Sequence, residues 1–546
     1  MNRIFGLALT ASSAAMVVAC GGSDDSTPAN TYSAARDTVA VTGGTVAASA
    51  DSSADLRVFK ALPFAAPPVG ALRWKAPQPV VAWNGIRRND SFSPACLMGN
   101  RPAGAIGAIL YQDSEPQSED CLYLNVWTGA APAAADKRPV MLLLHGGGYL
   151  LGSGAQPNYN GSGLAKKGAV VVTLNYRLGA LGFLAHPELT AESPNRASGN
   201  YALQDVIAAL QWVKANAAAF GGDPANVTVY SESAGAGLAS VLYASPPAAG
   251  LFHRLAIESL GALAAGTPNP TLAQAEAAGT TVAANLGAAN LAALRAKLPQ
   301  EVMAAAGAVN GPVVDGYVLP DQLDVLIRSG RTNDVPMLAG WNADEGTPYP
   351  AFATTLAGYN AAVAARYGAF AAQFRQVYPV STDADVLAMA YAPMRDSLFA
   401  WQPWTLARAH AAQNKSKTFL YFFTRRPAYY PDQKFNELDP PSRYGAYHSL
   451  EQVYFYNNLD RSAPPRPYDA VDRRIADVAS SYLVNFARNG DPNGASLPQW
   501  PVFANAASGQ TMEIGDTIAP TQVPFRPALD FFDAFYTQSL GRPLPF

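Results

Sequence analysis

The stretch "VTVYSESAGAG" (residues 227–237) contains the pattern on which the fold assignment depends. Its first half is β-branched and aromatic, which predicts a strand, and the small residues after Ser233 can begin a helix. A sharp strand-to-helix turn exposes the side chain at its apex, but the crowded backbone requires small residues two positions before and two after. Ser233 has Ser231 and Gly235 there, whereas Ser231 would have the β-branched Val229 before it. The pattern therefore predicts Ser233 as a nucleophile, and the alternative is a chance serine in a turn.

Apolar strand patterns and helical patterns alternate on both sides of this stretch. Residues 140–144 and 169–174 are apolar runs typical of strands that are covered on both faces. The apolar spacing of residues 200–219 is helical, and "GGDP" ends it. The later strand candidates are "HRLAIES" (253–259), "VPMLAGW" (335–341) and "TFLYFFT" (418–424), and the later helical regions are the Ala-rich stretches 267–329 and 348–411 and a helix closed by Gly490. This alternation predicts an α/β protein with a mostly parallel sheet and helices on both faces, and no linker divides residues 36–546.

A glycine-rich turn, "HGGG" (residues 145–148), follows one of the predicted strands. Glycines let backbone N–H groups approach a substrate closely, and such groups can stabilise a developing oxyanion. Gly147 and Gly148, together with Ala234 after the predicted nucleophile, are the expected donors. The alternative is a glycine turn with no role in chemistry.

The predicted nucleophile also needs a base, and the chain has only five histidines. In this type of fold the base follows the nucleophile in the sequence, which leaves His253, His410 and His448. His253 is about to enter a strand and His410 lies in a helical pattern, so a structural role is expected for each. His448, in the Gly- and Tyr-rich loop "YGAYHSLEQ" (444–452), is the predicted base.

The acid that orients the base must lie between the nucleophile and the base in this chain order. The segment "MLAGWNADEG" (337–346) leaves a predicted strand and brings Asp344 and Glu345 into a loop. Glu345 is the predicted acid. Asp344 is the alternative, although its carboxylate could brace the loop instead, and Asp315 is a further candidate with no strand exit before it.

Composition and charge exclude several classes of function. The formal net charge is −3, the pI is near 6.0, and no block of Lys or Arg is longer than two residues, so we expect no nucleic-acid partner. The sequence shows no metal-binding cluster and no nucleotide fingerprint, and no metal or other cofactor is predicted.

The N-terminus has the composition of an export signal. Residues 1–19 combine one positive charge with an apolar run too short to span a membrane, and the ending "VVAC" resembles a bacterial lipobox. We therefore expect cleavage before Cys20, lipid on its sulfur, and a flexible tether over residues 20–35. The tether would hold the folded domain (36–546) at a membrane, in the periplasm or at the cell surface. The alternative is ordinary signal cleavage and secretion.

Three cysteines, Cys20, Cys96 and Cys121, are present. If Cys20 carries lipid, one pair remains in an oxidising compartment, where either a disulfide or two buried thiols would fit the count.

Taken together, these segments resemble the type-B carboxylesterase family. The matching stretches are "EDCLYLNVW" (119–127), "HGGGY" (145–149), "NYRLGALGF" (175–183), "GNYALQDVIAALQWV" (199–213), "FGGDPANVTVYSESAGA" (220–236), "GLFHRLAIES" (250–259), "GWNADEG" (340–346) and "YHSLEQ" (447–452). They cover most of the mature chain.

The resemblance implies an α/β-hydrolase fold and a Ser-Glu-His triad, which fall on Ser233, Glu345 and His448. It also implies oxyanion donors at Gly147, Gly148 and Ala234, a Cys96–Cys121 disulfide, and an extra serine behind the triad at Ser259. The sequence departs from the family pattern at Ser231, Leu260 and Ser449, where Gly is usual.

The expected function is that of a serine carboxylesterase acting through an acyl-enzyme. A non-catalytic binding protein and a serine peptidase on the same fold are the alternatives. The segment 97–117 and the Ala-rich insertions are expected to shape the substrate pocket. Five aromatic residues are candidates either for the pocket or for the core: Trp341, Tyr349, Phe352, Trp401 and Trp404.

Overall fold

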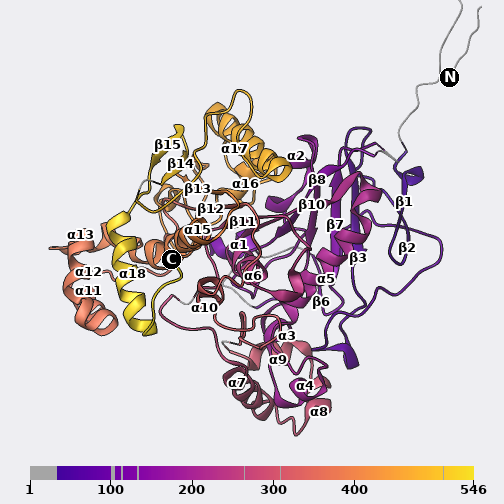
Figure 1. Ribbon diagram of the computed structural model, residues 1–546, viewed down its shortest axis with the longest axis horizontal. Coiled ribbons are helices and arrows are strands. Elements are labelled where there is room, and N and C mark those ends of the chain that lie inside the picture. Colours follow the sequence, from indigo (N-terminus) through magenta and orange to yellow (C-terminus); the bar gives the residue numbers. More distant parts are fainter. Residues whose placement is uncertain are drawn as a thin grey trace, which may run out of the picture.

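Strand β10 (Gly222–Glu232), which ends one residue before Ser233, lies in the middle of the largest sheet of the computed structural model (Figure 1). The structure describes residues 33–99, 105–111, 115–131, 135–263, 265–307, 309–507 and 509–546. Within them, this sheet has ten strands, in the spatial order β15 (Ile518–Gln522), β14 (Gln510–Ile514), β13 (Thr418–Phe423), β12 (Met337–Asn342), β11 (Arg254–Glu258), β10, β8 (Arg138–Leu144), β9 (Val170–Leu174), β7 (Tyr123–Thr128) and β3 (Arg57–Pro63).

The central strands of the sheet pair in parallel, from β9 through β8, β10, β11, β12 and β13 to β14. Antiparallel pairs occur only toward the two edges of this sheet, at β3–β7, β7–β9 and β14–β15. Val229 of β10 lies between Leu142 of β8 and Leu255 of β11, and all three side chains are fully buried. This pairing confirms the predicted mostly parallel sheet. Its central strands are apolar because helices cover them on both faces.

Several helices pack against the central strands of the sheet. Those in contact with the central strands include α2 (Ser162–Lys166), α5 (Tyr201–Asn216), α6 (Ala234–Tyr243), α15 (Trp401–Gln413) and α17 (Ala470–Asn489). The helix predicted over residues 200–219 is regular to Asn216 and tightens into a 3₁₀ turn (Ala217–Phe220), which Gly221 ends in the left-handed conformation. Gly490 closes α17 in the same conformation, as predicted.

The Ala-rich stretches form two helical lobes beside the sheet, one at the bottom and one at the left of Figure 1. The lower lobe contains α7 (Leu272–Asn285), α8 (Leu291–Arg295) and α9 (Pro299–Ala305), next to α3 (Gly179–Phe183) and α4 (Pro187–Glu192). The left lobe contains α11 (Leu356–Tyr367), α12 (Ala371–Val377), α13 (Asp383–Met389) and α18 (Arg526–Leu540). Between this lobe and α15, residues Arg395–Ala400 form a short π-helix.

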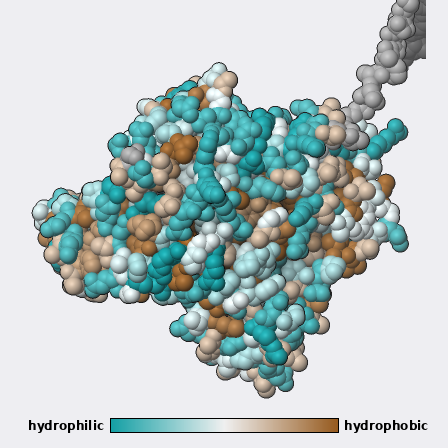
Figure 2. Space-filling view, viewed as in Figure 1, coloured by the Kyte–Doolittle hydropathy of each residue, from teal (hydrophilic) through white to brown (hydrophobic). Residues whose placement is uncertain are grey.

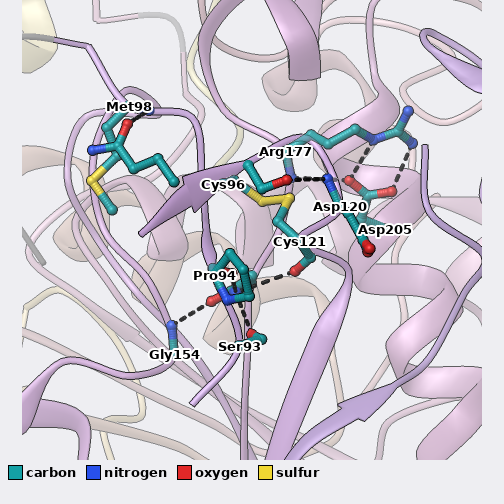
Figure 3. The surroundings of a disulfide bond; sticks show 12 residues. Ser93, Pro94, Cys96, Met98, Asp120, Cys121, Gly154, Arg177 and Asp205 are labelled. Carbon is teal, nitrogen blue, oxygen red and sulfur yellow. Dashed lines mark hydrogen bonds and ion pairs between the residues drawn. A yellow bond between two sulfur atoms is a disulfide. The ribbon is translucent and has the colours of Figure 1, made fainter. Parts of the chain in front are cut away.

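Cys96 and Cys121 are joined by a disulfide (Figure 3). Cys96 ends the short strand β5 (Ala95–Cys96), which pairs with β6 (Gln117–Ser118), and both cysteines are buried. The Asn175 side-chain amide donates a hydrogen bond to the Cys121 carbonyl oxygen at 3.2 Å. The bridge closes a loop of the chain that carries helix α1 (Ile106–Tyr111), and the alternative of two free thiols is wrong.

The surface seen in Figure 2 is a mixture of hydrophilic and apolar residues, with hydrophilic residues predominating. The large hydrophobic side chains that are exposed in the described residues come from separate segments: Val69, Val81, Ile86, Leu298, Leu387, Tyr430, Val502 and Phe546.

The predicted signal peptide and Cys20 lie outside the described residues. The described chain begins with a 3₁₀ turn (Ala34–Arg36) and strand β1 (Thr38–Val41), close to the predicted start of the hydrolase domain. Among the helices that the structure describes, none has the length and apolarity needed to cross a membrane.

Candidate active site

Ser233 lies at a sharp turn between β10 and α6. Its backbone has φ 53° and ψ −125°, a strained conformation for a residue other than glycine, and its N–H donates a hydrogen bond to the Glu258 carbonyl oxygen at 3.0 Å. A Cβ atom at Gly235 would collide with the carbonyl oxygen of Leu144 on β8. The Ser231 hydroxyl instead donates to the Ala256 carbonyl oxygen at 2.7 Å. The small residues on both sides of Ser233 are therefore required by close packing of the turn against β8 and β11.

The imidazole of His448 lies between Ser233 and Glu345. Its Nε2 atom is 2.8 Å from Ser233 Oγ, and its Nδ1 atom is 2.6 Å from Glu345 Oε2. Glu345 follows β12, and His448 lies in the loop between β13 and α16 (Gln452–Phe455). The three side chains therefore come from segments that follow the carboxyl ends of central strands. The side chains of His448 and Glu345 are 2% and 0% exposed. The structure thus brings the three predicted residues into one continuous hydrogen-bonded row.

Hydrogen bonds fix the Glu345 carboxylate behind the imidazole. The Ser259 hydroxyl donates to its Oε1 atom at 2.5 Å, and the Asn342 backbone N–H donates to the same oxygen at 2.6 Å. Burial raises the pKa of Glu345 above its usual range, whereas these two donors and the Arg395 guanidinium lower it. Ser259, expected behind the triad from the family resemblance, lies in direct contact with the predicted acid.

The two alternative acids brace loops instead of facing the imidazole. Asp344 accepts hydrogen bonds from the Arg426 guanidinium at 2.9 and 3.1 Å and from the Ala446 N–H at 2.8 Å. Asp315 accepts three backbone N–H groups of the turn that follows it.

The other candidate histidines have structural partners. His410 lies in α15, with Nδ1 2.8 Å from Thr418 Oγ1 and Nε2 2.9 Å from the Val335 carbonyl oxygen. The His253 ring accepts a hydrogen bond from the Val227 N–H at 3.0 Å. Neither ring is in the row formed by Ser233, His448 and Glu345.

The glycine turn after β8 lies against the nucleophile. A Cβ atom added to Gly146 would be 2.9 Å from the Ser233 Cβ atom. Gly147 has φ 104°, and a Cβ atom there would collide with the Leu151 backbone, so only glycine fits. Ala234 is the first residue of α6, and the first N–H groups of a helix have no acceptor within the helix. The predicted donors Gly147, Gly148 and Ala234 therefore belong to two segments that meet at Ser233.

Several residues near the imidazole were not predicted from the sequence. The Phe399 ring, from the π-helix, lies 4.3 Å from the His448 ring between centroids. Glu232 Oε1 is 3.3 Å from His448 Nε2, and Glu451 Oε1 is 3.3 Å from Ser259 Oγ. The position of Glu232 beside Ser233 in the sequence is a local signal, but nothing in the sequence indicates where its carboxylate points.

The five candidate aromatic residues divide between the core and the site. Trp341, Trp401 and Trp404 are fully buried and belong to the core. Phe352 is half-buried among aromatic rings of the left lobe. Tyr349 is half-buried with its ring 5.7 Å from that of His448, so it is the one of the five that lies beside the site.

The segment 97–117, expected to shape the pocket, is described in part. Tyr111, at the end of α1, lies within hydrogen-bonding distance of Glu232 and Ser449, so this segment reaches the site. In the part of the chain that the structure describes, no group of three or more His, Cys, Asp or Glu side chains is arranged to hold a metal ion.

The serine hydroxyl is hydrogen-bonded to an imidazole, and the imidazole is hydrogen-bonded to a buried carboxylate. This arrangement is suited to nucleophilic attack on a carbonyl carbon. The family model described as "Carboxylesterase family" matches residues 36–532. The chain therefore belongs to the type-B carboxylesterase family, has an α/β-hydrolase fold and is a carboxylic ester hydrolase.

Individual relatives support the same assignment. The chain is 37% identical to the fumonisin B1 esterase of Sphingopyxis macrogoltabida over 491 residues, which cover 85% of this chain and 84% of that protein. It is 33% identical to the para-nitrobenzyl esterase of Bacillus subtilis (strain 168) over 470 residues, which cover 82% and 88% of the two chains. A solved structure of a PNB esterase matches with a TM-score of 0.74 and 28% identity, covering 91% of this chain and 99% of that one.

Proposed function

We propose that the protein hydrolyses small-molecule carboxylic esters through an acyl-enzyme on Ser233. His448 removes the Ser233 proton as Oγ attacks the ester carbonyl carbon, and then gives the proton to the leaving alcohol. Glu345 holds the imidazole in orientation and stabilises its protonated form. The N–H groups of Gly147, Gly148 and Ala234 donate to the oxyanion of the tetrahedral intermediate. Water then releases the acid by the same steps.

The observation that carries this proposal is the row Glu345–His448–Ser233, with contacts of 2.6 and 2.8 Å, together with the close packing of the glycine turn against Ser233. A non-catalytic binding protein would need none of these contacts, and the relatives are esterases rather than peptidases. The relatives of the chain include a fumonisin B1 esterase, a cocaine esterase and a phenmedipham hydrolase. This range supports a small-molecule ester substrate without selecting one.

Ser233→Ala tests the nucleophile, with Ser231→Gly as the matched control two residues away. Ser233→Ala should lower kcat on a p-nitrophenyl ester by about four to six orders of magnitude. Ser231→Gly should remain active, because the Ser231 hydroxyl donates its hydrogen bond to the Ala256 carbonyl oxygen and takes no part in the row formed by Ser233, His448 and Glu345. A serine-directed organophosphate should label Ser233 in the wild-type protein. Near-full activity of Ser233→Ala would contradict the proposal.

We propose further that the protein is exported and held at a membrane by lipid on Cys20. The support is the sequence of residues 1–20 alone, with its short apolar run and "VVAC" ending.

A further inference from the structure

Ser449, the residue directly after His448, occupies a position that would favour glycine. Its φ is 74°, in the left-handed region, where a side chain adds strain. The sequence nevertheless has serine where the family pattern usually has glycine. Its side chain is buried, and its hydroxyl donates a hydrogen bond to Glu232 Oε1 at 2.5 Å. A strained residue with a hydroxyl used in this way indicates that the hydroxyl has a role.

A second hydroxyl from a distant part of the chain reaches the same carboxylate. The Tyr111 phenol oxygen lies 3.1 and 3.0 Å from the two carboxylate oxygens of Glu232 and is in hydrogen-bond contact with Ser449 Oγ. Tyr111 ends α1, inside the loop closed by the Cys96–Cys121 disulfide, and is separated from Ser449 by 338 residues. Two segments therefore converge on Glu232.

Glu232 faces the imidazole edge opposite to Glu345. Its Oε1 atom is 3.3 Å from His448 Nε2, the nitrogen that also contacts Ser233 Oγ at 2.8 Å. A Cβ atom at Gly146 would collide with the Glu232 carboxylate, so the glycine turn confines the carboxylate from the other side. The carboxylate is thus held by Ser449, Tyr111 and the turn, with one oxygen directed at Nε2.

We propose that Ser449 and Tyr111 are positioning residues that hold the Glu232 carboxylate at the Nε2 edge of His448, where it stabilises the imidazolium formed during acylation and deacylation. This inference rests on the proposed function. When Ser233 Oγ forms its bond to the carbonyl carbon, its proton moves to Nε2, and the new N–H lies between Ser233 Oγ and Glu232 Oε1. Glu232 takes no proton in this step; its charge stabilises the cation.

The surroundings explain why both donors matter. Burial, with a smaller contribution from Glu451, raises the pKa of Glu232 to about 8, although His448, Ser449 and Tyr111 lower it. The carboxylate form, which stabilises the imidazolium, therefore predominates only above about pH 8, and loss of either hydroxyl would raise the pKa of Glu232 and shift this boundary higher. The titratable groups that face Glu232 from the elements around it are His448, Glu258, Glu451, Tyr111, Tyr159, Tyr176, Tyr421 and Tyr456.

A double-mutant cycle between Ser449 and Glu232 tests the inference. Ser449→Ala, Tyr111→Phe and Glu232→Gln each remove one partner with little change in shape, and Ser449→Gly removes the hydroxyl while relieving the backbone strain. Stopped-flow acylation with p-nitrophenyl acetate gives the burst rate, and steady-state assays give kcat and KM. Ser449→Ala and Ser449→Gly should both lower the burst rate and kcat on the order of tenfold, with KM little changed, because each loses a hydrogen bond to a charged group. Ser449→Ala combined with Glu232→Gln should be no slower than Glu232→Gln alone.

Other outcomes would overturn the inference. A folded Ser449→Ala protein with the burst rate and kcat of wild type would overturn it. So would a double variant whose fold-loss in kcat equals the product of the fold-losses of Ser449→Ala and Glu232→Gln. If Glu232→Gln fails to fold, the pair Ser449→Ala and Tyr111→Phe gives the same test, because both hydroxyls act on one carboxylate and their effects should be less than multiplicative. Near-full activity of Ser233→Ala would overturn the proposed function together with this inference, whereas an inactive Ser233→Ala with independent losses at Ser449 and Glu232 would overturn this inference alone.

Discussion

At the scale of single residues, neighbouring side chains of the same chemical type have separate roles because the backbone directs them differently. Ser231 is the last residue but one of β10, and its hydroxyl is used by a backbone carbonyl of β11, whereas Ser233 is at the turn, beside the imidazole. Asp344 and Glu345 are adjacent, yet the carboxylate of Asp344 is hydrogen-bonded to Arg426 and that of Glu345 to His448. One position along the chain decides between bracing a loop and facing the site.

Glu345→Gln and Asp344→Asn form a matched pair of charge-removing substitutions. Glu345→Gln should lower kcat by about 100- to 10,000-fold with the fold intact, because an amide cannot hold the imidazole in the required tautomer and stabilise its cation. Asp344→Asn should stay within about tenfold of wild type, since it weakens only a partly exposed pair with Arg426. Steady-state kinetics with circular dichroism as a folding control measures both. The reverse order of damage would assign the acid to Asp344.

At the scale of elements, His410 ties helix α15 to the sheet beside β12 and β13. Its ring is fully buried and bridges the Val335 carbonyl oxygen and the Thr418 hydroxyl. Burial lowers the pKa of His410 to about 4, although the Val335 carbonyl and Asp334 oppose this. The histidine is therefore neutral in the folded protein at pH values where the unfolded chain already carries its charge.

Acid should consequently destabilise the fold through His410. The unfolded chain binds a proton at this residue near pH 6.5 and the folded chain only near pH 4, so the free energy of unfolding falls as the pH decreases between these values, by up to about 3 kcal/mol. Urea unfolding of wild type and His410→Gln from pH 4 to 8 measures the effect. The variant should lose less stability over this window than wild type, even if it is less stable at pH 8. Parallel curves for the two proteins would show that His410 does not titrate in this way.

At the scale of the whole molecule, the predicted anchor and the catalytic residues lie in separate parts of the sequence. The row of Ser233, His448 and Glu345 is built on the sheet, far along the chain from Cys20. The first strand that the structure describes, β1, begins at Thr38. Removal of the anchor is therefore expected to change location and leave the chemistry unchanged.

Cys20→Ala expressed with its native signal should release active enzyme from membranes into the soluble fraction, with kcat and KM unchanged. Two or three acyl chains on one cysteine are enough for stable anchoring, whereas one chain is marginal. Membrane fractionation and intact-mass analysis of the native protein provide the measurement. An unmodified N-terminal Cys20, or a mature chain that begins further along, would rule out the lipid.

The local order of elements and the reactive segments could be read from the sequence. Alternating apolar runs and helical spacings predicted the parallel sheet, and the small residues around Ser233 predicted the turn, because these features depend on neighbours only a few residues away. The glycine turn after β8 and the loop that carries His448 were found in the same way. Family resemblance added Ser259 and the disulfide.

The tertiary structure decided what depends on residues far apart in the chain. Glu345 reaches His448 across 103 residues, and Tyr111 meets Ser449 across 338, because strand register and loop paths bring those segments together. The sequence favoured the core for Trp341 and Trp404 but left the pocket open as an alternative, and packing shows that both are buried in the core. Local periodicity indicates which face of an element is apolar, but it carries no information on which distant element covers that face. For the same reason, only the tertiary structure shows that the Glu232 carboxylate lies at the Nε2 edge of His448.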